Sequence, residues 1–306
     1  MPEVPSGAGA PKLPSRKRVA GPAEQHDYFP KKACWGILTS QGSWADRSPL
    51  HEAASQGRLL VLRTLLAQGY PANIVTIDHV TPLHEACLSG HIACVRALIS
   101  SGANVNAATI DGLTPLYNCC RSGSLSCLEM LLQHGAHAHS VHTHYPSPLH
   151  EACKRGSSMC VKSLLSHGAD PSYESSHLGS PLYISCLHGQ AACSEVLLHT
   201  GARVNAGRGS DSPLHAAVRQ DCAEQVSLLL EFGADVNLRD DNNQRPLELA
   251  PPGGKTHQLL KSFQESPRSL CQLCRITIRD LIGPQKLKLL PMLPLPPLLT
   301  DYLNHK

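Results

Sequence analysis

Residues 81–106 read TPLHEACLSGHIACVRALISSGANVN, and variants of this stretch recur along most of the chain. Each recurrence opens with Ser or Thr followed by Pro-Leu, and a degenerate last unit opens with Arg. The openings are 33, 33, 33, 33, 32 and 33 residues apart, at Ser48, Thr81, Thr114, Ser147, Ser180, Ser212 and Arg245. So regular a period is typical of repeat proteins, in which each unit buries its apolar face only against its neighbours.

Each unit predicts a pair of helices. Ser or Thr before Pro supplies an N-cap, and Pro at the first helical position has no amide hydrogen to lose. Pairs such as Leu65-Leu66 give the second helix its buried face. A left-handed residue is needed where the first helix ends, and this position holds Gly57, Gly90, Gly123, Gly156, Gly189 and, against the rule, Asp221.

The residue after Pro-Leu completes the pattern, and it is His51, His84, Tyr117, His150, Tyr183 or His215. A 33-residue period with Thr-Pro-Leu-His is the ankyrin signature. We therefore predict an all-α fold, an ankyrin-repeat solenoid of helix pairs with β-hairpin-like tips, over residues 41–265. Its histidines are expected to bond neighbouring loops. Six full repeats would be followed by a degenerate cap at 244–265, whose helices the run Pro251-Pro252-Gly253-Gly254 would end early.

Charge and cysteine usage restrict the class of protein. Residues 41–266 carry 15 basic and 19 acidic residues, which argues against nucleic acid as the main ligand. No apolar run resembles a signal peptide or approaches a membrane span. Eight of the 13 cysteines share two repeat positions, which predicts core thiols: Cys87, Cys120, Cys153 and Cys186 at one, Cys94, Cys127, Cys160 and Cys193 at the other. A reducing compartment, the cytoplasm, is the expected location.

Residues 1–40 are rich in Pro and Gly, and we predict a mostly disordered tail. Its basic clusters Arg16-Lys17-Arg18 and Lys31-Lys32 resemble a bipartite nuclear signal, so the nucleus is an additional expected location. The more apolar segment Asp27-Tyr28-Phe29-Pro30, followed by Trp35, could pack on the first repeat or contact a partner.

No catalytic or metal site is predicted, and no cofactor is expected. Cys271-x-x-Cys274 has zinc spacing, but no second pair of ligands follows it at a suitable distance. His137, His139, His142 and His144 crowd one repeat tip and are interpreted as an exposed polar loop. No nucleophile lies in a Gly-x-Ser-x-Gly turn. The chain is therefore expected to bind proteins rather than to catalyse a reaction.

The C-terminal segment 266–306 carries two short motifs. Leu270, Cys274 and Ile278 are four residues apart, so on a helix they form one apolar stripe. A run of Leu293, Pro294, Leu295 and Pro296 follows. An ankyrin array followed by these motifs strongly resembles the ankyrin repeat and SOCS box family, whose box at 266–306 is expected to form three helices.

The resemblance implies a function for both parts of the chain. In that family the Leu-x-x-x-Cys-x-x-x-aliphatic helix binds elongin C, here through Leu270, Cys274 and Ile278, and elongin B accompanies it. A Leu-Pro-x-Pro motif, here residues 293–296, contacts a cullin, usually cullin 5, which brings a RING subunit. A second register, Leu295-Pro296-x-x-Leu299-x-x-Tyr302-Leu303, fits equally well. The complex is a ubiquitin ligase, and the ankyrin stack selects its substrate.

Three segments are similar to members five, nine and eleven of that family. The resemblance to member nine is the strongest, and it implies creatine kinase as a substrate. The segments are Trp44–Pro49, Ser176–Tyr183 and Arg245–Leu249. Two alternatives stay open at this point: a plain ankyrin scaffold whose tail merely caps the stack, and a basic-tailed nuclear cofactor.

The repeat tips vary most between units, so the tips and the inner helices are the expected substrate-binding surface, with help from the N-terminal tail. Aromatic and Arg side chains often anchor interfaces. The candidate substrate residues on the tips are Ile77, His79, Tyr145, Tyr173, His177 and Arg208.

Overall fold

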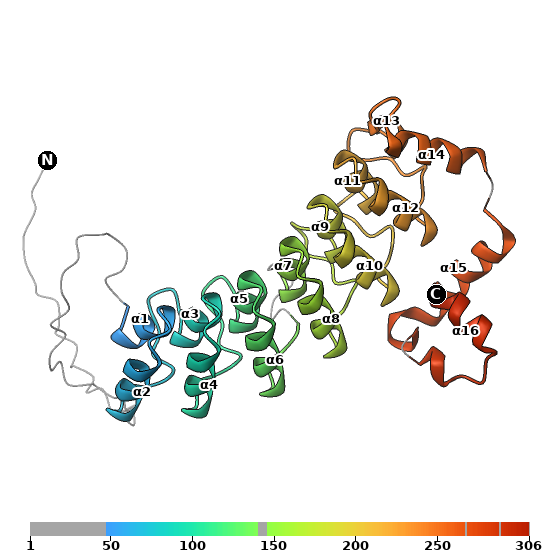
Figure 1. Cartoon of the computed structure of the whole chain (residues 1–306). Helices are drawn as coiled ribbons and strands as arrows, with labels where there is room; N and C mark the ends of the chain where they lie inside the picture. The colour runs from blue at the N-terminus through green and yellow to red at the C-terminus, as the bar shows by residue number, and fades with distance from the viewer. Residues whose placement is uncertain (1–46, 140–145, 267, 288, 306) are drawn as a thin grey trace, which may run out of the picture. The chain divides into compact units, whose positions relative to one another are not determined.

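The computed structural model describes residues 47–305 apart from 140–145, 267 and 288. The tail 1–40, its basic clusters and Tyr145 lie outside the described residues. Twelve helices form six successive pairs: α1 Pro49–Ser55 with α2 Leu59–Ala67, α3 Pro82–Leu88 with α4 Ile92–Ser100, α5 Pro115–Ser122 with α6 Leu125–Gln133, α7 Pro148–Arg155 with α8 Ser158–Ser166, α9 Pro181–Leu187 with α10 Ala191–His199, and α11 Pro213–Arg219 with α12 Ala223–Glu231. First helices lie beside first helices and second beside second, in chain order (Figure 1). This confirms the predicted ankyrin architecture.

The opening motif both starts a helix and joins it to the next repeat. Ahead of α3, the Thr81 Oγ1 lies 2.8 Å from the His84 Nδ1, and the His84 backbone N–H donates to the same hydroxyl oxygen. The His84 Nε2 lies 3.1 Å from the carbonyl oxygen of Leu113, in the next repeat. His51, His150 and His215 make the same contact with the following unit. Burial lowers the pKa of His84 to about 4, so this bridging side chain is neutral at physiological pH.

The repeat tips are hairpin-like, but in the described part of the chain they contain no extended strand. Isolated antiparallel bridges join Ser175 to Gly179 and Arg208 to Asp211. The tip of the first repeat is closed by the Thr76 N–H, which donates to the Val80 carbonyl at 3.0 Å. The described tips are thus tight turns rather than parts of a sheet.

The degenerate cap differs from its prediction in one respect. Its first helix, α13 Pro246–Leu249, is short as expected, but its second, α14 Lys255–Glu265, has 11 residues where other second helices have nine. The Pro-Pro-Gly-Gly run lies between the two helices, and Gly254 serves as the N-cap of α14. It therefore truncates only the helix before it. Asp221, the exception to the glycine rule, still takes the left-handed conformation, with φ of 49°.

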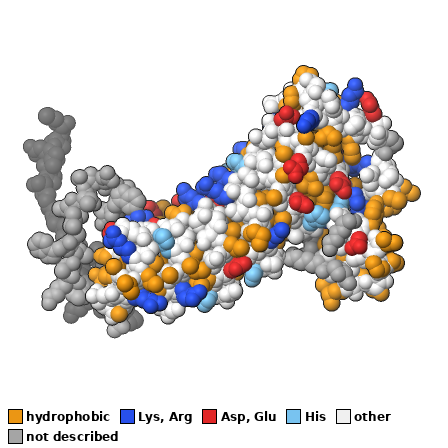
Figure 2. All heavy atoms as spheres, viewed as in Figure 1, with side chains coloured by type: hydrophobic (Ala, Val, Ile, Leu, Met, Phe, Trp, Pro, Cys, Tyr) orange, Lys and Arg blue, Asp and Glu red, His pale blue; other side chains and the backbone are white. Residues whose placement is uncertain are grey.

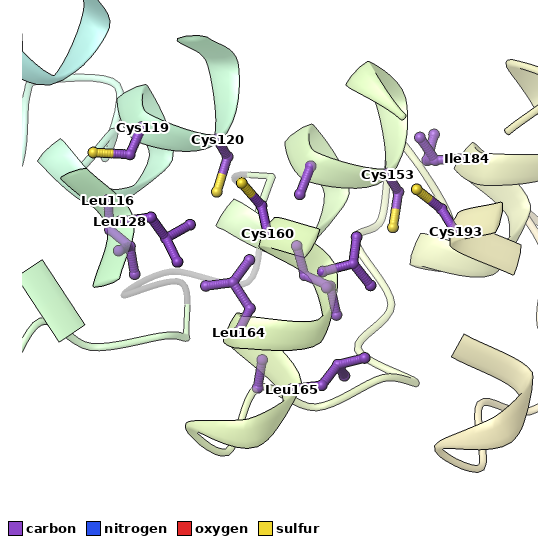
Figure 3. Close-up of a cluster of buried hydrophobic side chains, with 14 of the residues drawn as sticks. Leu116, Cys119, Cys120, Leu128, Cys153, Cys160, Leu164, Leu165, Ile184 and Cys193 are labelled. Carbon is purple, nitrogen blue, oxygen red and sulfur yellow. The ribbon is translucent and has the colours of Figure 1, made fainter. Parts of the chain in front are cut away.

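The core of the stack is built from leucine, alanine and cysteine (Figure 3). The eight phased cysteines are buried, as predicted, and so is Cys119. Cys120 and Cys160 point toward each other between neighbouring repeats, as do Cys153 and Cys193 (Figure 3). Burial raises the pKa of Cys193 to about 11, and an uncharged thiol packs as a small apolar group.

We expect an alkylating reagent to distinguish these thiols from the exposed ones. Cys271 and Cys274 are exposed, so they should react in the native chain. The nine buried thiols should react only after denaturation, because the protonated, buried form is a poor nucleophile. Mass spectrometry without reduction measures both sets, and the denatured chain is the control. Disulfides among the buried cysteines would contradict the assignment of reduced core thiols.

The C-terminal segment forms a small helical module. Helix α15, Leu270–Leu287, is interrupted at Gly283, whose φ of 72° and ψ of 164° are not helical. The short 3₁₀ helix η1, Leu290–Met292, and helix α16, Pro297–Leu303, follow. The module has its own small core of Leu287, Leu290 and Leu303, against which Ile282 and Leu295 pack.

Candidate functional site

The predicted apolar stripe of α15 lies on the surface of the module. Leu270 is 75% exposed, and Cys274 and Ile278 are exposed as well. Leu281 lies three helical turns after Leu270 and is 82% exposed. Leu273 borders the same stripe and is also exposed. The part of α15 from Leu270 to Leu281 thus presents a continuous apolar surface that no part of the described chain covers.

The opposite side of α15 is fastened to the repeats by arginine. Arg279 is buried, and its Nη2 donates to the Leu198 carbonyl oxygen of α10 at 2.9 Å. Its Nη1 donates to the Leu303 carbonyl oxygen of α16 at 2.7 Å. Its guanidinium lies 5.3 Å from the centre of the Phe232 ring, at the end of α12. Burial, assisted by the charge of Arg275, lowers the pKa of Arg279. One side chain therefore joins the fifth and sixth repeats to both helices of the module.

Aromatic and ionic contacts extend this attachment. The His305 ring stacks on Phe232 at 3.7 Å, and its Nδ1 lies 3.3 Å from the Glu231 Oε1. Burial lowers the pKa of His305 to about 4, so this stack involves a neutral ring at physiological pH. Arg275 lies over the Tyr302 ring at 4.8 Å and pairs with Glu231 at 3.8 Å. These contacts hold α15 so that Arg275 and Arg279 face the stack while Leu270 and Leu281 face outward.

Sequence reasoning missed the two arginines of this attachment, Arg275 and Arg279, and part of the stripe. Arg275 and Arg279 are four residues apart on the side of the helix opposite the stripe, which is the one signal that was available. The partners of Arg279 lie 24 and 81 residues away in the chain, so no local pattern could identify them. Leu281 could have been found by extending the stripe by one more turn.

The Leu-Pro-Leu-Pro run lies between η1 and α16. Leu293, Pro294 and Pro296 are exposed, whereas Leu295 is half-buried against the core of the module. In the second register, Leu299 is exposed and Leu303 is buried. Exposed Met292 and Leu298 flank the run, and hydrophobic atoms are prominent over this part of the surface (Figure 2). Both registers therefore contain exposed residues that a partner can reach.

The predicted substrate residues fall into two groups rather than one. Ile77 and His79 are exposed on the tip of the first repeat. His177 and Arg208 are exposed on the tips that end the fourth and fifth repeats. Tyr173 is half-buried, with its ring edge against His150 at 5.8 Å between centres, so part of its surface is used within the fold.

Arg208 borders a surface hollow of about 300 Å³ between two neighbouring tips. The residues around it are Glu174, Ser175, Ser176, Gly179, Gly207, Arg208 and Gly209. Gly179 approaches Gly207 so closely that a side chain at position 179 would lie 2.5 Å from the Gly207 carbonyl oxygen. The hollow offers both charges and hydroxyl groups, and sequence reasoning had named only Arg208 among its residues.

No group of three or more His, Cys, Asp or Glu side chains in the described chain is placed to hold a metal ion. None of the described helices is both long enough and apolar enough to cross a lipid bilayer.

A repeat stack joined to a small module with an outward apolar stripe defines a two-part protein-binding molecule. Family models match both parts: ankyrin repeats at residues 50–142, 136–208 and 196–250, and a SOCS box at 266–304. The crystal structure of the human ASB11 ankyrin repeat domain is similar, with a TM-score of 0.68 and 47% identity over 73% of this chain and 100% of that one. The ankyrin repeat domain of Bcl-3 gives a TM-score of 0.59 and 29% identity over 70% of this chain and 98% of that one.

Curated relatives extend the likeness along the chain. Ankyrin repeat and SOCS box protein 5 of Bos taurus is 57% identical over 272 residues, 89% of this chain and 82% of the relative. Protein 11 of Mus musculus is 49% identical over 78% of this chain and 74% of the relative. Protein 9 of Homo sapiens is 48% identical over 106 residues, 35% of this chain and 36% of the relative.

The chain belongs to the ankyrin repeat and SOCS box family. Its predicted placement near members five, nine and eleven is confirmed. Of the three relatives, member five is matched at the higher identity and over the larger part of the chain, so the resemblance to member nine does not by itself select a substrate. An ankyrin stack with a SOCS box makes the chain an ankyrin-based substrate adaptor of a SOCS-box ubiquitin ligase.

Proposed function

We propose that this chain is the substrate receptor of a ubiquitin ligase built from elongin B, elongin C, cullin 5 and a RING subunit. The observation that supports this proposal is the outward-facing apolar stripe of α15. In a plain scaffold whose tail only caps the stack, the stripe would be buried against the repeats, whereas here Arg279 faces the repeats and Leu270 faces outward. A large exposed apolar surface on a folded chain is typical of a protein-binding site.

Elongin C is the proposed occupant of the stripe. Leu270, Cys274 and Ile278 are the proposed contact residues, and Leu281 extends the same surface by one turn. A preformed helix is a favourable ligand, because its backbone is already ordered and little conformational entropy is lost on binding. Elongin B is expected to join through elongin C.

Cullin 5 is the proposed partner of Leu293, Pro294, Leu295 and Pro296. Proline presets an extended backbone, which lowers the entropic cost of binding, and Leu293 offers an exposed apolar group beside it. Leu295 is expected to contribute chiefly by holding this run against the core of the module.

Changing Pro294 and Pro296 to Ala should weaken cullin 5 binding by about tenfold, because each proline contributes up to ~1 kcal/mol through restricted backbone freedom. Elongin binding should persist. The measurement is titration of cullin 5 into the preformed elongin B/C complex of each variant. Pro297→Ala is the matched control, since Pro297 follows the Leu-Pro-Leu-Pro run and occupies an unspecified position of the second register. Loss of elongin binding in the double variant would contradict separable docking of the two partners.

The substrate is proposed to be a protein that binds the repeat tips. Exposed His177 and Arg208, together with the hollow beside Arg208, form one proposed contact area, and Ile77 with His79 forms a second. Tyr173 and Tyr145 complete the proposed set. Creatine kinase is one candidate substrate. The cytoplasm is the proposed compartment, with the nucleus as an additional one.

Reconstitution tests the proposed function directly. The full chain is expected to co-elute with elongins B and C, and then with cullin 5 and its RING subunit. A chain that retains its fold but fails to bind the elongins would exclude the ligase assignment and favour the plain scaffold. Affinity purification under proteasome inhibition then identifies the substrate.

A further inference from the structure

A side-chain oxygen closes the tip of the first, second and sixth repeats. It belongs to the residue five positions before the opening of the next unit, which is Thr76, Thr109 or Asp240. In each case this oxygen accepts a hydrogen bond from the backbone N–H four residues later, at 3.1, 3.1 and 2.9 Å. In these three tips the side chain is therefore used within its own turn.

The fourth and fifth tips depart from this rule. The equivalent residue of the fourth tip is Ser175, but the Gly179 N–H donates to the Ser175 backbone carbonyl at 2.9 Å instead of to its hydroxyl. Ser175 is 3% exposed, and its Oγ has no hydrogen-bond partner in the described chain. The equivalent residue of the fifth tip is Gly207, which has no side chain. A buried hydroxyl without a partner is costly, so Ser175 indicates a place that a ligand can satisfy.

The surface hollow of about 300 Å³ lies between these two tips. Ser175 and Ser176 line it from the fourth tip, and Arg208 and Gly209 line it from the fifth. Its volume is at the low end of the range found for ligand pockets. The hollow therefore suits a single side chain of a partner better than a whole small-molecule ligand.

The charges around the hollow leave Arg208 available. Glu174 also lines the hollow, but its Oε1 pairs with Arg203 at 3.6 Å. Asp211, later in the fifth tip, pairs with Arg219. Arg208 is exposed and forms no ion pair within the part of the chain that the structure describes. The hollow thus combines an unneutralised guanidinium with an unpartnered hydroxyl, and both groups donate hydrogen bonds.

We propose that this hollow binds a carboxylate side chain, Asp or Glu, from an exposed segment of the substrate protein. The planar guanidinium of Arg208 offers the carboxylate two parallel N–H donors. Ser175 is the second donor, and rotation about its one side-chain bond turns its hydroxyl to the ligand. Phosphate groups are ordinarily held by clusters of Arg, whereas a single Arg lines this hollow. The inference rests on the proposed function only in naming a ligase substrate as the source of the carboxylate.

Peptide titration followed by NMR tests the site in the full chain. The probe is a pentapeptide with both ends blocked and a central Glu, and the matched probe has Gln in place of Glu. The Glu peptide should shift the backbone amide signals of residues 174–179 and 207–209 in a saturable manner. It should bind about tenfold more tightly than the Gln peptide, because hydrogen bonds to a charged acceptor are the stronger ones.

Variants assign the two donors. Arg208→Gln should weaken binding of the Glu peptide by about tenfold, and Ser175→Ala by about fivefold. Ser175→Ala should not lower the midpoint of thermal unfolding, because its hydroxyl has no partner to lose. Thr109→Ala should lower it, because the Thr109 hydroxyl closes its own turn. Arg239→Gln is the charge-matched control and should bind as the native chain does, because Arg239 is an exposed arginine on the sixth tip.

Four results would overturn the carboxylate site. They are equal affinity for the Glu and Gln peptides, native affinity in the Arg208 variant, signal shifts confined to other tips, and no saturable shift at peptide concentrations up to ~10 mM. A pentaglycine peptide with a free C-terminus supplies the same chemical group from the end of a chain. Tighter binding of this probe than of the Glu peptide would overturn the assignment to a side chain.

Elongin binding separates this inference from the proposed function. Each variant is also titrated with elongins B and C. A chain that assembles with the elongins and cullin 5 but does not bind the Glu peptide refutes the carboxylate site alone. A chain that binds the peptide but not the elongins refutes the ligase assignment and leaves the site in place.

Discussion

Replacing Leu270 and Cys274 by Ala should reduce elongin B/C binding by about 100-fold or more and leave the ankyrin stack intact. Truncating a leucine that becomes buried costs about 2–5 kcal/mol, and a loss of ~3 kcal/mol corresponds to about 100-fold in affinity. In the free chain both side chains are exposed, so their truncation should change the free energy of unfolding by no more than ~0.5 kcal/mol. Calorimetric titration measures the first effect and thermal unfolding the second.

Two further variants sharpen this prediction. Leu281→Ala should also weaken elongin binding, because Leu281 continues the stripe. Met159→Ala removes an exposed apolar side chain from the repeats instead, so it should leave elongin binding as in the native chain. If the Leu270 and Cys274 double variant binds the elongins as well as the native chain does, the stripe is not their docking site.

Arg279→Met is expected to release the C-terminal module from the repeats while elongin binding persists. The variant keeps an apolar stem but removes the hydrogen bonds to the Leu198 and Leu303 carbonyl oxygens. Hydrogen bonds from a charged donor contribute ~1.5–3 kcal/mol each, so a loss of about 3 kcal/mol is expected. The amides of α15 should then exchange about 100-fold faster, which hydrogen-exchange mass spectrometry measures. Ubiquitin transfer should also slow, because the two bound partners are no longer held at a fixed separation.

Arg239→Met is the control for this second prediction. Arg239 is exposed, and its Nη1 donates to the nearby Asn243 carbonyl oxygen, far from α15 in the sequence, so its loss should leave exchange in α15 unchanged. Native-like protection of α15 in the Arg279 variant would show that the stacking of His305 on Phe232 is enough to hold the module.

The repeat architecture was predictable because its determinants are local. A Ser or Thr N-cap, Pro at the first helical position and a left-handed residue at the end specify each first helix within about ten residues of sequence. The period then brings equivalent positions together, which is why the buried state of Cys120 and Cys153 could be predicted from their phase alone. The contact between repeats from the His84 ring to the Leu113 carbonyl oxygen was predictable as well, because the period fixes which residue of the next repeat lies beside each histidine.

The degenerate cap at 244–265 shows that the composition of a short segment does not by itself determine where helices end. Pro251 and its neighbours predicted early helix ends, and the run does interrupt the chain, but only between α13 and α14. The effect of a helix-breaking residue depends on its position relative to the start of a helix. Gly254, at the N-cap of α14, begins a helix instead of ending one.

The orientation of α15 is what the tertiary structure alone decided. The sequence by itself determined an amphipathic helix with Leu270, Cys274 and Ile278 on one side, and an apolar side ordinarily faces a core. Here the polar side faces inward, because Arg279 finds the Leu198 carbonyl 81 residues away and Phe232 supplies an aromatic ring beside it. A helix of this composition is compatible with either orientation, and only contacts between distant parts of the chain select the one that leaves the leucines exposed for a partner.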